Sequence, residues 1–68
     1  MDRLPVKSEK LESVGYDPLS ETLELEFTPG DIYRYGQVPK YIFTNLLLAE
    51  SKISYFHVYI KENYPIIF

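Results

Sequence analysis

The side chains of this chain that are best suited to binding are aromatic rings, some of them placed beside a basic group. Seven Tyr and four Phe occur among 68 residues, and Tyr33 and Tyr35 flank Arg34. Exposed rings can stack on unpaired bases at about 1–3 kcal/mol per base, and an Arg can contact phosphate. The candidate contacts for RNA or for a protein partner are Tyr33, Arg34, Tyr35, Tyr55, His57 and Tyr59.

Catalytic and metal chemistry have little support in the residue types present. The chain has no Cys and one His, which excludes disulfides, thiolate zinc sites and histidine-rich metal sites. His57 has no nucleophile or acid partner at a fixed spacing, and Ser51 is better placed to cap a helix. Glu24 and Glu26 share one strand face, as on any solvated strand. We therefore expect no enzyme activity, no catalytic residue, no metal and no cofactor.

The composition is that of one small globular domain, residues 1–68. Hydrophobic residues make up 46% and charged residues 25%, with a net charge of −3 and a pI of about 4.9. This acidic balance gives no general attraction to phosphate backbones. The chain has no run of about 18 apolar residues, and its charged N-terminus lacks the apolar core of a signal peptide. We expect a cytoplasmic protein with no membrane partner.

The spacing of apolar residues predicts three strands followed by two helices. The elements expected are strands at about 10–16, 22–28 and 31–36 and helices at about 39–49 and 52–62. Ser51 is expected to cap the second helix. The fold class is therefore α+β, a three-stranded antiparallel sheet with two short helices packed on one face. Residues 1–8, interrupted by Pro5, are expected to form a flexible arm.

The Pro29-Gly30 turn leaves two registers for the hairpin between the second and third strands. A two-residue loop buries Arg34 on the apolar face. A three-residue loop ending at Gly30 gives instead the pairs Leu25–Tyr33, Leu23–Tyr35 and Glu24–Arg34. We favour the second register, because it keeps an aromatic and aliphatic face and joins opposite charges on the other face. Tyr33 and Tyr35 then face the helices, and Arg34 pairs across the hairpin.

Most of the aromatic residues are expected to form the core. The inward-facing set is Tyr16, Phe27, Tyr33, Tyr35, Phe43, Phe56 and Tyr64, and the exposed set is Tyr41, Tyr55, Tyr59 and Phe68. The apolar tail has two interpretations, because such a segment must dock on its own core or on a partner. Either it folds back, or it forms an oligomer contact through Ile66, Ile67 and Phe68.

Several fixed spacings occur together along the chain. They are Val14-Gly15-Tyr16-Asp17, then Leu23, Leu25, Phe27 and Gly30, then Tyr33, Tyr35, Val38 and Pro39, then Ala49, Ser51, Tyr55, Phe56, Ile60 and Tyr64. Over residues 6–65 this pattern closely resembles the KTSC domain, which occurs at the C-terminus of some lysyl-tRNA synthetases and as small stand-alone bacterial and phage proteins. Two departures are Ile53, where the family usually has Gly, and His57, where an Asn often stands.

The resemblance implies a small non-catalytic binding or appendage domain of unsettled role. RNA binding has been suggested for the family, which is an argument from association and not from mechanism. The alternative is a protein-interaction or homo-oligomerisation module that uses the sheet edge and the apolar tail. The acidic balance favours a protein partner and the family context favours RNA, so both interpretations stay open.

Overall fold

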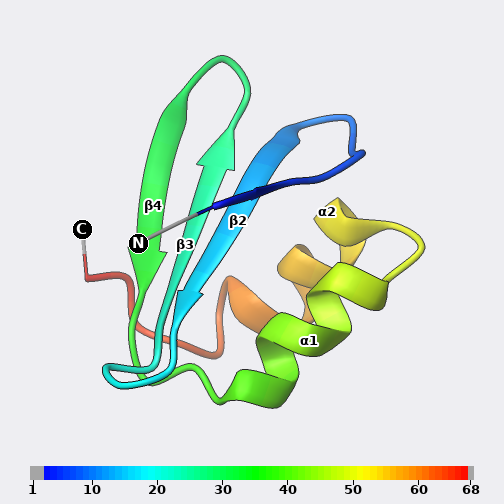
Figure 1. Cartoon of the computed structure of the whole chain (residues 1–68). Helices are drawn as coiled ribbons and strands as arrows, with labels where there is room; N and C mark the ends of the chain where they lie inside the picture. Colours follow the sequence, from blue (N-terminus) through cyan, green and yellow to red (C-terminus); the bar gives the residue numbers. More distant parts are fainter. Residues whose placement is uncertain (1–2, 68) are drawn as a thin grey trace.

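A computed structural model covers the whole chain and describes residues 3–67. An antiparallel sheet of four strands, in the order β1-β2-β3-β4, is covered on one face by the helical segments (Figure 1). The elements are β1 (Leu4–Pro5), β2 (Leu11–Asp17), β3 (Thr22–Phe27), β4 (Asp31–Tyr35), α1 (Lys40–Leu48), α2 (Lys52–Tyr55) and the π-helical turn η1 (Phe56–Ile60). Within residues 3–67 no helix is long and apolar enough to cross a lipid bilayer.

The α+β layering expected from the sequence is confirmed, but the expected number of strands is wrong. The fourth strand, β1, comes from the segment that we assigned to an arm. Leu4 lies opposite Val14 and Pro5 opposite Ser13, and the Val6 N–H donates to the Glu12 carbonyl at 3.0 Å. A two-residue strand that contains a Pro has no alternation to detect, and its Pro is tolerated because β1 lies at the sheet edge.

A bulge in β2 accounts for the three-residue spacing of the apolar Leu11 and Val14, a spacing that a helix would also give. Leu11 pairs with Phe27 and Ser13 with Glu26, so the register shifts by one residue between them. The extra residue puts Leu11 and Val14 on the same face, although strand residues three apart normally face opposite ways. Both side chains are buried in the core. The three-residue spacing is therefore compatible with a strand and needs no helix.

The hairpin has the register that we favoured. Its pairs are Leu23–Tyr35, Glu24–Arg34, Leu25–Tyr33, Glu26–Ile32 and Phe27–Asp31. The loop therefore holds three residues and ends at Gly30, whose φ of +140° is one that residues with side chains rarely adopt. This register sends Tyr33 and Tyr35 to the helical face and Arg34 to the opposite face.

The second helical segment is shorter and less regular than expected. Instead of one helix over 52–62, a short α-helix is followed by a π turn, in which the Lys61 N–H donates to the Phe56 carbonyl five residues back at 2.9 Å. Ser51 caps its start as predicted, and its side chain accepts from the Ser54 N–H at 3.3 Å. The first helix matches its expected range within one residue at each end.

The core lies between the sheet and the helical layer and is organised around one aromatic ring. Its buried members are Leu11, Val14, Leu23, Leu25, Tyr35, Val38, Ile42, Leu46, Phe56 and Ile60. The Phe56 ring meets Phe27 edge-on at a centroid distance of 5.3 Å and Tyr35 at 5.7 Å. Phe56 stands where α2 becomes η1, so it fixes the second helical segment to the sheet. A chain without disulfides thus uses aromatic packing for stability.

The outer face of the sheet carries a charged network around Glu24. The carboxylate accepts a hydrogen bond from Arg3 Nη1 at 3.0 Å and pairs with Arg34 Nη2 at 2.7 Å. Arg3 Nε also donates to Ser13 Oγ at 3.1 Å, and that hydroxyl donates to Glu26 at 2.8 Å. The Glu24 side chain is 3% exposed. The expectation that it is solvated is therefore wrong, because Arg3, just before β1, covers it.

The C-terminal tail returns to β4 (Figure 1). Its backbone contacts are an antiparallel bridge between Tyr35 and Ile66 and two 2.8 Å hydrogen bonds, from the Gly36 N–H to the Pro65 carbonyl and from the Ile67 N–H to the Arg34 carbonyl. Ile66 and Ile67 remain 52% and 54% exposed. Phe68, the third residue of the expected oligomer contact, lies outside the described residues. The tail thus folds back along the edge of its own sheet, while its two isoleucines stay half exposed.

Candidate functional site

The sequence-predicted contacts on β4 do not form one surface. Tyr35 is 6% exposed and its ring packs against Phe56. Tyr33 is 40% exposed at the rim of the helical face. Arg34 points to the outer face, where its guanidinium pairs with Glu24. Because successive strand residues point to opposite faces, a ligand on the helical side meets Tyr33 without Arg34.

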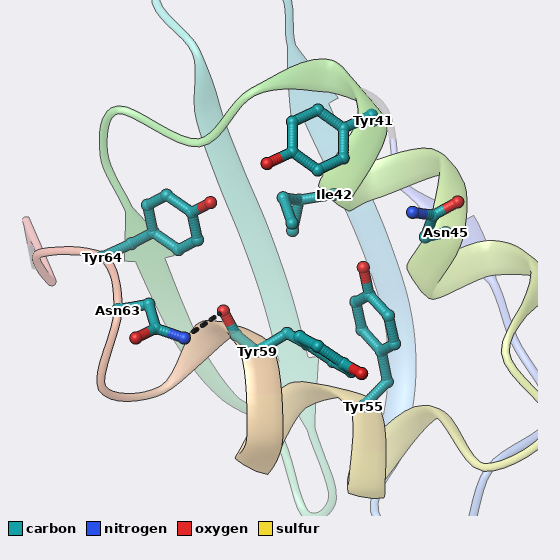
Figure 2. Close-up of a pocket in the computed structure, with 7 residues that line it drawn as sticks. All are labelled: Tyr41, Ile42, Asn45, Tyr55, Tyr59, Asn63 and Tyr64. Carbon is teal, nitrogen blue, oxygen red and sulfur yellow. Dashed lines mark hydrogen bonds between the residues drawn. The ribbon is translucent and has the colours of Figure 1, made fainter.

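A second group of aromatic residues comes together between the helical segments. A pocket of about 500 Å³ opens between α1 and the α2–η1 segment. It is lined by four tyrosines, two asparagines and one isoleucine, namely Tyr41, Tyr55, Tyr59, Tyr64, Asn45, Asn63 and Ile42. Figure 2 shows the four rings arranged around the Ile42 side chain. We call this group of seven residues the tyrosine pocket.

Helical spacing places these side chains on two facing rows. Tyr41 and Asn45 are four residues apart on α1 and therefore lie on the same face. Tyr55 and Tyr59 are four residues apart on α2–η1, and their ring centroids are 4.6 Å apart with the planes tilted by 37°. Asn63 follows four residues later. The short connection between α1 and α2 brings the two rows to opposite sides of the pocket (Figure 2).

The lining residues differ in exposure, so the pocket has a floor and an open mouth. Ile42 is 5% exposed and belongs to the core, so it forms the floor. Tyr41 and Tyr59 are 62% and 51% exposed and stand at the mouth. Tyr55 and Tyr64 are partly buried and pack against the core. The rings of Tyr41 and Tyr59 are thus positioned by the fold and remain accessible to a ligand. The buried ring of Tyr35 is not accessible.

Hydrogen bonds and burial fix the polar atoms at one end of the pocket. Asn63 Nδ2 donates to the Tyr59 carbonyl at 3.0 Å and reaches the Val58 carbonyl at 3.5 Å, which satisfies the carbonyls at the end of η1. The hydroxyls of Tyr41 and Tyr64 point toward each other (Figure 2). Burial, followed by the neighbouring Tyr41, raises the pKa of Tyr64. Like an ordinary phenol, that hydroxyl is neutral at physiological pH and can donate or accept a hydrogen bond.

None of the residues that line the tyrosine pocket is charged. Its polar atoms are phenol hydroxyls and carboxamides, which suit neutral donors and acceptors. Among residues 3–67 there is also no group of three His, Asp or Glu side chains that could hold a metal ion. The tyrosine rings can stack on a flat ligand, and the hydroxyls and carboxamides can hydrogen-bond to its edge.

The sequence predicted part of this site and missed the rest. Tyr55 and Tyr59 were candidate contacts, and the fold brings them together. His57 was also a candidate, but its exposed ring lies against Phe56, at a centroid distance of 5.4 Å, and it does not line the pocket. Tyr64 was assigned to the core, where it packs with its outer part facing the pocket.

The two asparagines were not singled out at all. A signal was nevertheless present for Asn45, which stands four residues after Tyr41 on a predicted helix face, whereas Asn63, four residues after Tyr59, lies just past the predicted end of the second helix. A neutral amide on the same face as two accessible rings is typical of a binding surface more than of a core. Recognising it required knowing that the two helices face each other.

Comparisons with known proteins agree on one family. The family model described as the KTSC domain matches residues 7–64. An uncharacterized protein of Stutzerimonas stutzeri is 39% identical over 64 residues, covering 94% of this chain and 90% of that protein. The crystal structure of a KTSC domain protein from Yersinia pestis superposes with a TM-score of 0.92 at 35% identity, covering 96% of this chain and 92% of that one.

A third comparison connects the same residues with a larger enzyme. The lysine–tRNA ligase of Nostoc sp. is 41% identical over 54 residues. The matched region is 79% of this chain but 10% of the ligase. The similarity is thus to a small part of that enzyme and covers most of the present fold.

Proposed function

We propose that this chain, which belongs to the KTSC domain family, is a non-catalytic module that binds single-stranded RNA in its tyrosine pocket. The observation that carries the proposal is the set of four tyrosine rings held around a pocket of about 500 Å³, with Tyr41 and Tyr59 more than half exposed at its mouth. Accessible aromatic rings that stack on bases are one of the two devices of proteins that bind single strands, the other being a positively charged groove along the backbone.

The relatives supply the reason to consider RNA. A region similar to this chain makes up about a tenth of a lysine–tRNA ligase, an enzyme whose name includes an RNA substrate. A module of this kind needs no catalytic residues of its own. By this argument the present chain makes RNA contacts of its own.

The experiment is a titration of a fluorescently labelled single-stranded RNA with the full chain, followed by anisotropy. A base-paired hairpin of the same composition is the matched ligand control. Because a paired base must first be unstacked, at a cost of a few kcal/mol, we expect the single strand to bind at least about tenfold more tightly. Equal affinity for the two ligands, or no binding at low salt, would overturn the proposal.

Arg34 provides a prediction that separates the tyrosine pocket from a site on β4. Its guanidinium is committed to the buried Glu24 carboxylate at 2.7 Å. We expect Arg34→Ala to lower the free energy of unfolding by about 1–3 kcal/mol, because part of the compensation of a buried acid is lost. RNA affinity, measured where the variant is still folded, should change by less than about twofold. A tenfold loss of affinity with unchanged stability would place the RNA on β4.

A second candidate function is self-association through the tail, because Ile66 and Ile67 are half exposed on the edge of β4. Sedimentation of the full chain and of a chain without residues 66–68 distinguishes a tail that joins two copies from a tail that only covers the edge of β4. If the tail is an oligomer seam, the full chain is dimeric and the truncated chain monomeric. If the tail only covers the edge of β4, the full chain is monomeric and truncation promotes association, because an uncovered edge strand pairs with other chains.

A further inference from the structure

We infer that the tyrosine pocket recognises one unpaired nucleoside, its base and ribose, and leaves the phosphates outside. This inference deepens the proposed function and rests on it for the source of the nucleoside. It commits the site to base insertion instead of tracking of the RNA backbone. Those are the two ways in which proteins usually hold single strands, and they often occur together.

The size and shape of the pocket support a single small ligand. Its volume of about 500 Å³ lies within the range of about 300–1,000 Å³ that is typical of small-molecule sites. The buried Ile42 closes it from below, and rings from α1, from α2–η1 and from the segment after η1 surround it (Figure 2). The exposed Tyr41 and Tyr59 stand at the entrance, where a flat heterocycle can stack on their rings.

The polar chemistry of the pocket matches a nucleoside and not a phosphate. Hydroxyls and carboxamides pair with the neutral donors and acceptors on base edges and on ribose hydroxyls. Tyr and Asn can also hydrogen-bond phosphate oxygens, but the strong phosphate contacts are the charge-assisted ones from Arg and Lys, and none of the residues that line the pocket carries a charge. The net charge of −3 gives the surface around it no general attraction for the backbone. The affinity must therefore come from the base and the sugar.

Two measurements test this inference on the full chain. The first follows backbone amide chemical shifts by NMR during titration with adenosine, guanosine, cytidine and uridine, and with the 5′-monophosphate of the tightest of them. We expect shifts at the tyrosine pocket, and dissociation constants for the nucleoside and its monophosphate that agree within about threefold. The second measures the affinity for single-stranded RNA at 50 and 200 mM salt. One released counterion corresponds to a loss of about threefold over this range, so we expect a loss of threefold or less.

Tyr41→Ala supplies the matched variant, because Tyr41 is 62% exposed and its loss should leave the core intact. We expect its nucleoside affinity to fall by about fivefold or more. Thr44→Ala, an exposed change on the same helix outside the pocket, should leave it unchanged.

The outcomes separate this inference from the proposed function. RNA binding that falls a hundredfold or more with salt, together with no nucleoside binding, would overturn nucleoside recognition and keep RNA binding. Nucleoside binding without RNA binding would support nucleoside recognition in the tyrosine pocket and overturn the proposed binding of single-stranded RNA. Shifts of the same residues by a proline-rich peptide, with none by any nucleoside and none by single-stranded RNA, would overturn both, because aromatic-lined grooves also bind polyproline segments.

Discussion

Replacing Tyr59 with alanine is expected to weaken the binding of single-stranded RNA by about fivefold to 150-fold. Tyr59 stands at the mouth of the tyrosine pocket, half exposed, with its ring 4.6 Å from that of Tyr55. One stacked base contributes about 1–3 kcal/mol, and each 1.4 kcal/mol is about tenfold in affinity. Because 51% of the residue is exposed, the free energy of unfolding should change by less than about 1 kcal/mol. Anisotropy and urea denaturation measure the two quantities.

The matched control is the neighbouring residue. Val58 is 64% exposed on the same π turn and does not line the pocket. Val58→Ala should therefore leave RNA affinity unchanged, although it removes a similarly accessible apolar side chain. If both variants lose affinity equally, the effect belongs to the helix surface in general and the pocket is not the site.

Replacing Phe56 with alanine is expected to lower the free energy of unfolding by about 3–5 kcal/mol. The ring is 5% exposed and contacts the rings of Phe27 and Tyr35, so its removal leaves a cavity in the core. A chain of this length has a total stability of about 3–10 kcal/mol. The variant should therefore be largely unfolded at 37 °C, as measured by thermal denaturation with circular dichroism.

Two companion variants keep this prediction informative. His57→Ala removes an exposed ring that touches Phe56 from outside, and should cost less than about 0.5 kcal/mol. Phe56→Leu keeps most of the buried volume and should lose much less stability than the alanine variant. If Phe56→Ala costs no more than His57→Ala, then Phe56 does not fix the second helical segment to the sheet.

The sequence predicted the parts of the fold that depend on residues close together in the chain. The alternation from Leu23 to Phe27 defines one core face of the strand. Only the observed hairpin register keeps Arg34 off that face, so the register could be predicted. The cap at Ser51 is equally local, because it depends on a hydroxyl three residues before an amide.

The features that the sequence did not predict depend on contacts between distant segments. The strand β1 is two residues long and exists because β2 offers it an edge. The burial of Glu24 follows from it, since Arg3 reaches the carboxylate only when β1 is in place. An isolated strand pattern with Glu at alternate positions gives no indication of that cover.

The site was predicted in part for the same reason. Tyr59 could be recognised as exposed, because it stands on the polar side of a helix, whereas Tyr55, expected there too, is partly buried against the core. Tyr41 and Asn45 lie on another helix, and nothing in the local sequence says that the two rows face each other across a pocket. Aromatic content alone was a better guide to the core than to the site, since most of the rings pack inside.

The most direct test of the central claim is to map where a single-stranded RNA binds. In an amide NMR titration of the full chain with a short unstructured RNA, we predict the largest shifts on α1 and α2–η1 around Tyr41, Asn45, Tyr55 and Tyr59. Residues of β4 and the outer face around Arg34 should move little. Shifts concentrated on β4 or the tail, or no shifts at saturating RNA and low salt, would contradict the account.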